Sequence, residues 1–260
     1  MESVKQPCDI DMKKLKVSPL KTMGNGVTKI AFVTLGDGPF NLQLPEMYAP
    51  FGTNIWENTD NGTFKYSVNL SFRDMDKRES LKKFYKFLED FDEFIVQYAL
   101  DHSYEFFKKR YTSLEVVRAL YPCSIKQSID KLTGEINPKY PPTCKITIPY
   151  RNDKFQMETY NKDAELIDFS TIVNNLKGAK ITVILQNIQL WIAGGKFGAT
   201  LKSQQMQVIP KATITGFAIK NNKEDRIPDG EDIDDISNGV SKTSVTNGDN
   251  LIDDSDDENI

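Results

Sequence analysis

The chain has 260 residues, of which 33 are Lys or Arg and 37 are Asp or Glu, so its formal net charge is −4. Residues 229–260 hold eleven of the acids and one base, which gives this tail a charge of −10 and leaves the first 228 residues at +6. A hydrophobic content of 39% is enough for a core, while the absence of a long apolar run or an apolar leader argues against a membrane span or secretion.

The first half of the chain predicts strands followed by helices. Residues 27–35 and 40–44 are rich in β-branched and aromatic side chains, and residues 63–72 alternate between apolar and polar positions, as a half-buried strand does. Apolar residues then recur every three or four positions up to about residue 110, after a capping pair of Asp76 and Glu79. A second short helix is expected at about 113–121.

The second half of the chain returns to strands. A hairpin is expected from 144–150 and 155–160, and a short helix from 168–178. A long strand at 180–193 turns at Gly194–Gly195 into a return strand at 196–209, and one more strand is expected at 211–220. Residues 221–260 are too polar and acidic to offset the entropy of ordering, so we predict a disordered tail.

Patterns for catalysis are weak. The single histidine, His102, lies within the helical pattern, and Cys8, Cys123 and Cys144 are too far apart for a metal site. The glycine-rich stretch 194–200 lacks the spacing of a phosphate loop and is better explained as a hairpin turn. Asp74 and Asp76 could hold magnesium in a nuclease, although helix capping is the simpler explanation. We therefore expect no enzyme activity, no cofactor and no metal.

Positive charge is the strongest signal in the body of the chain. Residues 169–223 contain seven lysines and no acid, and residues 12–36 and 136–152 are also free of acids. Strands without acids present a positive potential to a polyanion. Binding of a single nucleic-acid strand without sequence preference also needs aromatic side chains on which bases stack. The candidate platforms are Tyr48, Phe51, Trp56, Tyr150, Phe155, Trp191 and Phe197.

The acidic tail suggests a second role. The segment NLIDDSDDENI at the end of the chain combines a few apolar residues with dense acid. Such a tail could compete with nucleic acid for a basic groove, and it could recruit the basic surface of another protein once displaced. The tail residues expected to act in this way are Asp253, Asp254, Asp256, Asp257 and Glu258. A tail that serves solubility alone is the alternative.

The hairpin sequence KITVILQNIQLWIAGGKFGATLKSQQMQVI at 180–209 resembles one family. It is similar to the single-stranded-DNA-binding proteins of nucleocytoplasmic large DNA viruses, the group of African swine fever virus and its algal-virus and giant-virus relatives. The similarity extends well over about thirty residues of the chain. The resemblance implies an OB-like β-barrel that coats single-stranded DNA during viral replication, inside the host cytoplasm or nucleus, with presence in the virion left open.

These observations together predict a β-rich (α+β) protein. We expect an OB-like nucleic-acid-binding domain over residues 1–220, with a helical insertion at about 77–121, and an acidic tail over 221–260. Its expected partners are single-stranded DNA, with RNA left open, replication or recombination proteins held by the tail, and a second copy of the chain. The residues predicted to bind nucleic acid are Lys65, Arg73, Tyr150, Arg151, Lys154, Trp191, Lys196, Phe197 and Lys202.

Two other functions fit the same sequence. A viral structural or scaffold protein would use the β core without nucleic acid and recruit partners through the acidic tail. A magnesium-dependent nuclease would use Asp74, so that Asp74→Asn would abolish cleavage. Salt-dependent binding of a single strand separates the binding protein from the scaffold, because only the former neutralises phosphates.

Overall fold

A computed structural model describes residues 4–24, 26–36, 38–59, 62–186 and 188–212. Residues 213–260 lie outside the described residues, and with them most of the strand predicted at 211–220 and the whole acidic tail predicted at 221–260. The described part is mostly β, as the sequence predicts, and no helix in it is long and apolar enough to cross a membrane.

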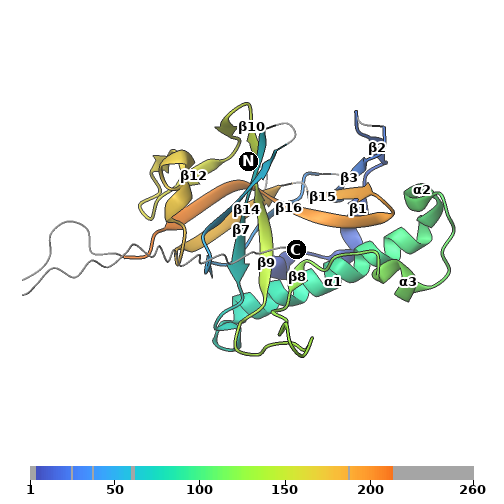
Figure 1. Cartoon of the computed structure of the whole chain (residues 1–260), viewed down its shortest axis with the longest axis horizontal. Helices are drawn as coiled ribbons and strands as arrows, with labels where there is room; N and C mark the ends of the chain where they lie inside the picture. Colours follow the sequence, from blue (N-terminus) through green and yellow to red (C-terminus); the bar gives the residue numbers. More distant parts are fainter. Residues whose placement is uncertain (1–3, 25, 37, 60–61, 187, 213–260) are drawn as a thin grey trace, which may run out of the picture. The chain divides into compact units, whose positions relative to one another are not determined.

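Five strands close into a barrel, and they meet around the ring in the order β5–β7–β9–β16–β14. Figure 1 labels β7, β9, β14 and β16 where they lie together. All neighbouring pairs are antiparallel except β9 with β16. Numbered along the chain, this ring runs first, second, third, fifth, fourth, so the protein has the OB-like barrel that was expected. The ring strands are β5 (Met47–Tyr48), β7 (Thr63–Ser71), β9 (Thr143–Ile148), β14 (Lys180–Gln186) and β16 (Lys196–Ile209).

Strand β16 connects the barrel to a second group of strands. It pairs with β15 (Gln189–Ala193) in its first half and with β14 in its second half, where the register shifts between Ile184 and Leu185. The predicted single strand at 180–193 is therefore wrong, because β14 and β15 are separate strands with different partners. The two-residue turn is confirmed, since Gly194 and Gly195 have φ values of 58° and 76°.

The second group of strands extends the sheet beyond the barrel through β15. Strand β3 (Lys29–Leu35) pairs with β15 and carries β1 (Leu15–Val17) and β2 (Lys21–Thr22). Strand β4 (Asn41–Gln43) lies against β14. The remaining strands are β6 (Thr53–Asn58), β8 (Ile125–Lys126), β10 (Tyr150–Arg151), β11 (Lys154–Phe155), β12 (Glu158–Tyr160) and β13 (Leu166–Ile167).

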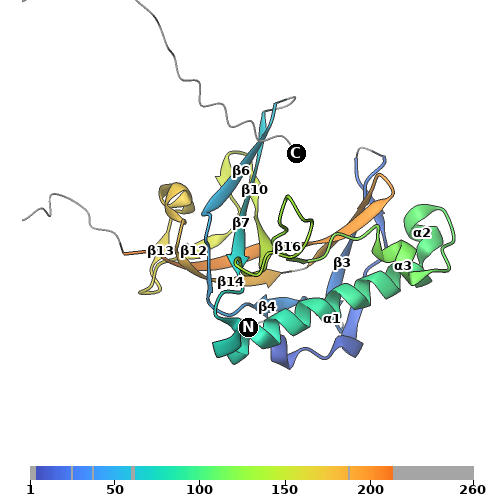
Figure 2. The ribbon, with the colours of Figure 1, turned by 60° about the horizontal axis from the view of Figure 1, so that its bottom comes forward.

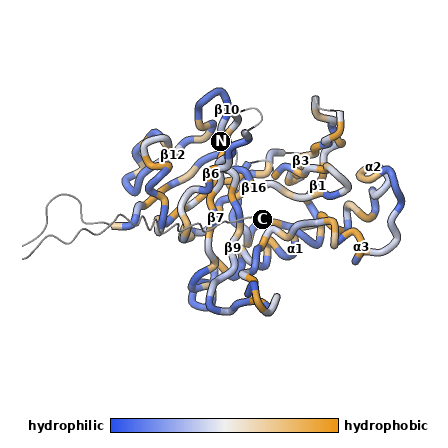
Figure 3. Tube along the Cα trace, in the orientation of Figure 1, coloured by the Kyte–Doolittle hydropathy of each residue, from blue (hydrophilic) through white to orange (hydrophobic). Residues whose placement is uncertain are grey.

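The helical insertion lies between the second and third barrel strands, within the predicted range 77–121. It consists of α1 (Glu79–Asp101), α2 (Ser103–Phe107) and α3 (Leu114–Arg118). Hydrophobic and hydrophilic residues are interspersed along α1 (Figure 3), and the helix runs beneath the strands (Figure 2). Its buried face carries Phe84, Phe87 and Phe91. Phe84 stacks on Phe72 with ring centroids 5.6 Å apart, and Phe87 lies 6.3 Å from Phe40.

Two local predictions differ from the structure. The N-cap of α1 is Arg78 instead of Asp76, which lies in the short 3₁₀ helix η3 (Met75–Lys77). The helix predicted at 168–178 is two 3₁₀ turns, η4 (Phe169–Thr171) and η5 (Val173–Asn175), although Gly178 does end the segment with φ of +78°. Two more 3₁₀ turns, η1 (Pro7–Asp9) and η2 (Met12–Lys14), precede β1.

A buried carboxylate ties α1 to the segment that follows α3. Asp92 is 7% exposed, and it accepts hydrogen bonds from the Tyr121 hydroxyl at 2.7 Å and from the backbone N–H and hydroxyl of Ser124 at 2.8 and 2.6 Å. Burial raises the pKa of Asp92, and these hydrogen bonds partly oppose that shift. The contact holds the helical insertion against the chain that leads into β8.

We predict that Asp92→Ala lowers the free energy of unfolding by about 2–3 kcal/mol, because it leaves the buried Tyr121 hydroxyl with only the Ser124 hydroxyl, 3.5 Å away, as a partner. Asp92→Asn should cost less, since its amide oxygen still accepts a hydrogen bond. Urea unfolding followed by circular dichroism measures both values. Equal stability of Asp92→Ala and the original chain would contradict this account of the insertion.

Candidate nucleic-acid interface

The outer surface of β7 and β9 is built by strict alternation of side chains. Their register places Val68 beside Ile146, and both are fully buried inside the barrel. The adjacent pair, Ser67 beside Thr147, must then point outward. Strand β6 adds Asn54 to this outer row and β16 adds Lys202, so four neighbouring strands form a floor of short polar side chains that ends in a lysine.

A groove of about 710 Å³ lies over this floor. Its sides come from the β6–β7 ribbon and from the turn between β9 and the β10–β11 hairpin, and Figure 2 shows β6, β7 and β10 rising together from the barrel. We call it the basic groove. It is lined by Asn54, Trp56, Phe64, Lys65, Tyr66, Ser67, Lys145, Thr147, Ile148, Pro149, Tyr150, Arg151, Gln156 and Lys202.

The basic groove contains four cations and no carboxylate among its lining residues. The cations are Lys65, Lys145, Arg151 and Lys202, and they come from three barrel strands and one hairpin. The pKa of Lys145 is lowered, first by partial burial and then by the nearby charges of Lys126 and Lys65. Crowded cations repel one another, so an anion in the groove would relieve this repulsion.

Aromatic side chains stand at the sides of the groove. Trp56 lies opposite Lys65 across the β6–β7 pair, and the Lys65 Nζ atom is 4.7 Å from the centroid of the Trp56 ring. The Trp56 side chain is 51% exposed, so its ring has free surface for stacking. Tyr150 lies against Tyr66 with ring centroids 4.8 Å apart at the other side.

The structure brings four of the predicted binding residues together in the basic groove, namely Lys65, Tyr150, Arg151 and Lys202. Lys154 is near them, because it pairs with Arg151 across the β10–β11 hairpin, but it lines a neighbouring recess. Arg73 lies outside the groove, where its guanidinium is 3.5 Å from Asp74 and 5.4 Å from the ring of Tyr48. Arg73 is therefore not part of this site.

The other three predicted residues belong to the β15–β16 hairpin and do not line the groove. Phe197 is fully buried, and its ring lies 5.1–5.9 Å from the rings of Tyr121, Phe106 and Phe107. This burial corrects the prediction that Phe197 stacks on a base. Side chains alternate along the strand, so Phe197 points into the core while its neighbour Lys196 points outward.

The Trp191 side chain packs against the β15–β16 hairpin that carries it. A Cβ atom on Gly198 would lie only 2.6 Å from the Trp191 ring, so the ring rests on the glycine backbone of the neighbouring strand. One face of the indole is thereby occupied by the protein. The predicted tail residues Asp253, Asp254, Asp256, Asp257 and Glu258 lie outside the described residues.

Among the groove residues that were not predicted to bind nucleic acid, Trp56 and Lys145 matter most. The sequence places Trp56 among the aromatic candidates, and the Asn61–Gly62 dipeptide after it is a hairpin signal that could have paired its strand with the one carrying Lys65. Lys145 and Thr147 share one face of a predicted strand, and the buried Cys144 and Ile146 share the other. This alternation could have identified Lys145 as outward-facing.

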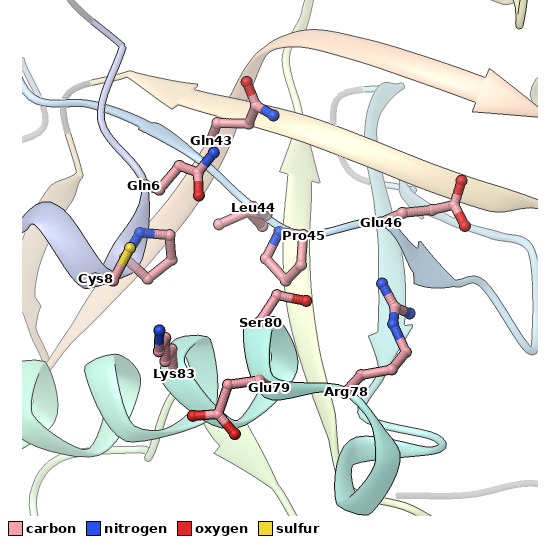
Figure 4. Close-up of a pocket in the computed structure, with 11 residues that line it drawn as sticks. Gln6, Cys8, Gln43, Leu44, Pro45, Glu46, Arg78, Glu79, Ser80 and Lys83 are labelled. Atoms are coloured by element: carbon pink, nitrogen blue, oxygen red, sulfur yellow. The ribbon is translucent and has the colours of Figure 1, made fainter.

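A smaller pocket of about 290 Å³ lies between the first residues of the described chain and the start of α1 (Figure 4). Its charges are balanced, because Glu46 and Glu79 line it together with Arg78 and Lys83. It therefore lacks the positive excess of the basic groove. Among the described residues, no group of three or more His, Cys, Asp or Glu side chains is placed to hold a metal ion.

Several solved structures are similar to this chain, among them two single-stranded DNA-binding proteins of bacteriophages. One is gp2.5, a single-stranded DNA binding protein encoded by bacteriophage T7, with 10% identity and a TM-score of 0.41 over 70% of this chain and 92% of that chain. The other is the single-stranded DNA-binding protein of bacteriophage Enc34 in complex with ssDNA, with 14% identity and a TM-score of 0.41 over 78% of this chain and 98% of that chain.

No protein-family model matches the sequence, and no curated protein matches it. Structural similarity at this level does not transfer binding residues from one chain to another. The case for the basic groove therefore rests on the geometry and charge of this chain.

We predict that Phe197→Ala lowers the free energy of unfolding by about 3–5 kcal/mol, as the loss of a buried ring does. Trp56→Ala should change it by less than about 1 kcal/mol, because half of that side chain is exposed. Urea unfolding of the two variants tests the difference between a core ring and a surface ring. A stable Phe197→Ala variant would contradict the assignment of this ring to the core.

Proposed function

We propose that this protein binds single-stranded DNA along the basic groove without reading its sequence. The observation that carries the proposal is the outer surface of β7, β9 and β16, where Lys65, Lys145 and Lys202 surround a polar floor with no carboxylate among the lining residues. In OB barrels, the second and third strands are the usual binding surface for oligonucleotides. Here these strands are β7 and β9.

The groove offers separate contacts to the two parts of a strand. The lysines and Arg151 can neutralise phosphates, and the short side chains of Ser67 and Thr147 leave room for the backbone to approach. The exposed ring of Trp56 can stack on a base, and stacking of this kind tolerates any base. Because a base must be unpaired to stack on a side chain, the arrangement favours a single strand over a duplex.

The proposed role requires no bond-making chemistry, and we propose that the protein is not an enzyme. The resemblance of residues 180–209 to the proteins of large DNA viruses favours a role in viral DNA replication, recombination or repair. Such a role would place the protein where viral DNA is copied, in the cytoplasm or nucleus of the host cell. The tail would recruit other proteins of that process through its acidic residues.

We predict that the full chain binds labelled oligo-dT more tightly than a matched duplex in fluorescence anisotropy. If all four groove cations contact phosphates, the slope of log affinity against log salt should be about −3, since each phosphate contributes about 0.7 on a single strand. Trp56→Ala should weaken oligo-dT binding by about five- to one-hundredfold, as the loss of one stacked base does.

Two lysine variants make the test specific to the groove. Lys202→Ala should reduce the salt slope by about 0.7, because one phosphate contact is lost. Lys82→Ala on α1 is the matched control, because Lys82 is exposed, lies 3.9 Å from Glu79 and is not part of the groove. An equal effect of both substitutions would show that net charge, and not the groove, determines binding. Absence of oligo-dT binding at low salt would reject the function.

We also propose that the acidic tail competes with DNA for the positive charge of the groove. The proposal rests on the charges of −10 over residues 229–260 and +6 over the remainder of the chain. A tethered polyanion has a high effective concentration, so it can compete without high intrinsic affinity.

Removal of the tail charge should strengthen oligo-dT binding several-fold at low salt, and the gain should fade as salt screens the charges. The comparison uses a chain ending at Ile227 and a full-length variant in which Asp253, Asp254, Asp256, Asp257 and Glu258 become Asn or Gln. The neutralised variant keeps the length of the tail and so isolates its charge. Unchanged affinity in both variants would show that the tail does not compete with DNA, and its proposed role would then be limited to binding partner proteins.

A further inference from the structure

A second hollow lies directly beside the basic groove, and we call it the aromatic recess. Its volume is about 790 Å³, and its lining residues come from β7, from the β10–β11 hairpin and from the segment that carries β12, β13 and η4. Tyr66 and Tyr150 line both hollows, so the recess continues the groove across these two rings. A cavity of this size exceeds the space that one nucleobase needs.

A row of aromatic rings in contact with one another leads from the groove into the recess. The ring of Tyr150 lies 4.8 Å from Tyr66 and 4.9 Å from Phe155, and Phe155 lies 4.7 Å from Phe169. Tyr150 and Phe155 are themselves a cross-strand pair of the hairpin, which closes through Asn152 and Asp153 at φ values of 51° and 57°. Phe169 is 2% exposed and belongs to the core, so the ring surface open to a base comes from the half-buried Tyr66, Tyr150 and Phe155.

The sign of the charge changes between the two hollows. The groove has four cations and no carboxylate among its lining residues, whereas the recess has Asp153, Glu158 and Asp168 with Lys154 as its one lining cation. This excess of negative charge disfavours a phosphate in the recess. An uncharged base carrying hydrogen-bond donors has no such penalty.

The carboxylates differ in how far the protein already uses them. Glu158 accepts hydrogen bonds from the Tyr160 hydroxyl and the Gln205 amide, both at 3.0 Å. Asp168 accepts the backbone N–H of Ser170 at 2.9 Å through Oδ1, and this hydrogen bond, together with a weaker one from the Ser170 side chain, lowers the pKa of Asp168. A carboxylate has about four acceptor positions, so these two contacts leave positions open.

We propose that the aromatic recess receives one unstacked nucleobase from a strand in the basic groove, and that Asp168 accepts a hydrogen bond from the exocyclic amino group of that base. The inference rests on the proposed function, because the groove must hold the strand. Adenine, cytosine and guanine carry an exocyclic amino group, whereas thymine presents an oxygen and a methyl group in its place. The recess therefore adds a base preference to a groove that reads no sequence.

The test compares oligo-dC with oligo-dT of equal length, since both are pyrimidines and differ at the amino position, at N3–H and at the 5-methyl group; oligo-dU, which lacks the methyl group, is measured beside them and should bind as oligo-dT does. Anisotropy is measured with the full chain at mildly alkaline pH, where cytosine is unprotonated. The original chain should bind oligo-dC about fivefold more tightly, in line with one hydrogen-bonded base contact. In Asp168→Asn, the ratio of oligo-dC affinity to oligo-dT affinity should fall close to one with little loss of oligo-dT affinity, because the amide can donate a hydrogen bond to the thymine oxygen.

Two matched pairs of variants control the test. Asp163→Asn makes the same change at an exposed position outside the recess and should keep the ratio. Ser170→Leu fills the recess from an exposed lining position and should abolish the preference for oligo-dC, whereas Ser170→Ala, which removes the same hydroxyl from Asp168 without filling the recess, should keep it. The leucine variant keeps Asp168 and so tests the recess even if Asp168→Asn fails to fold.

The outcomes separate the recess from the groove. If the original chain binds both oligonucleotides equally, or if Asp168→Asn and Ser170→Leu leave the ratio unchanged, the recess does not read a base and the proposed function still stands. If the original chain binds neither oligonucleotide, the proposed function fails first and the recess inference fails with it.

Discussion

The parallel pairing of β9 with β16 is the constraint on which the rest of the structure depends. It closes the barrel and fixes the register in which Leu201 lies beside Ile146 and Lys202 beside Thr147. Side chains alternate along a strand, so a slip of one residue would turn Lys202 into the barrel and Leu201 out to solvent. The same register thus fills the core and places the fourth cation of the groove.

The helical insertion and the β15–β16 hairpin pack against this barrel and leave the basic groove open. Phe197 packs among rings of the insertion, and its backbone N–H donates to the Leu120 carbonyl at 3.3 Å. The hairpin is therefore held toward the helices, while the β6–β7 ribbon and the β10–β11 hairpin border the basic groove. One end of β16 serves the core, and its middle carries Lys202 into the groove.

The local patterns of the sequence predicted much of the fold, but they did not predict the long-range strand pairings. Alternation over 63–72 and the helical period after Glu79 depend on neighbouring residues, so β7 and α1 could be read directly. The division of 180–193 into two strands depends on partners far away in the sequence. The pairing of Trp56 with Lys65 is a hairpin contact between residues only nine positions apart, and it was missed because residues 53–58 lack the alternation of a half-buried strand. Burial of Phe197 could not be predicted either, because its aromatic neighbours come from the insertion.

The central claim is that a single strand lies over β7 and β9, beside Trp56 and away from Trp191. The chain has two tryptophans, so Trp191→Phe leaves Trp56 as the one fluorescent indole and Trp56→Phe leaves Trp191. Titration of each variant with oligo-dT measures contact at each position directly. The account predicts strong quenching of Trp56 and little change at Trp191. Quenching of Trp191 alone would contradict it and would move the binding surface to the β15–β16 hairpin.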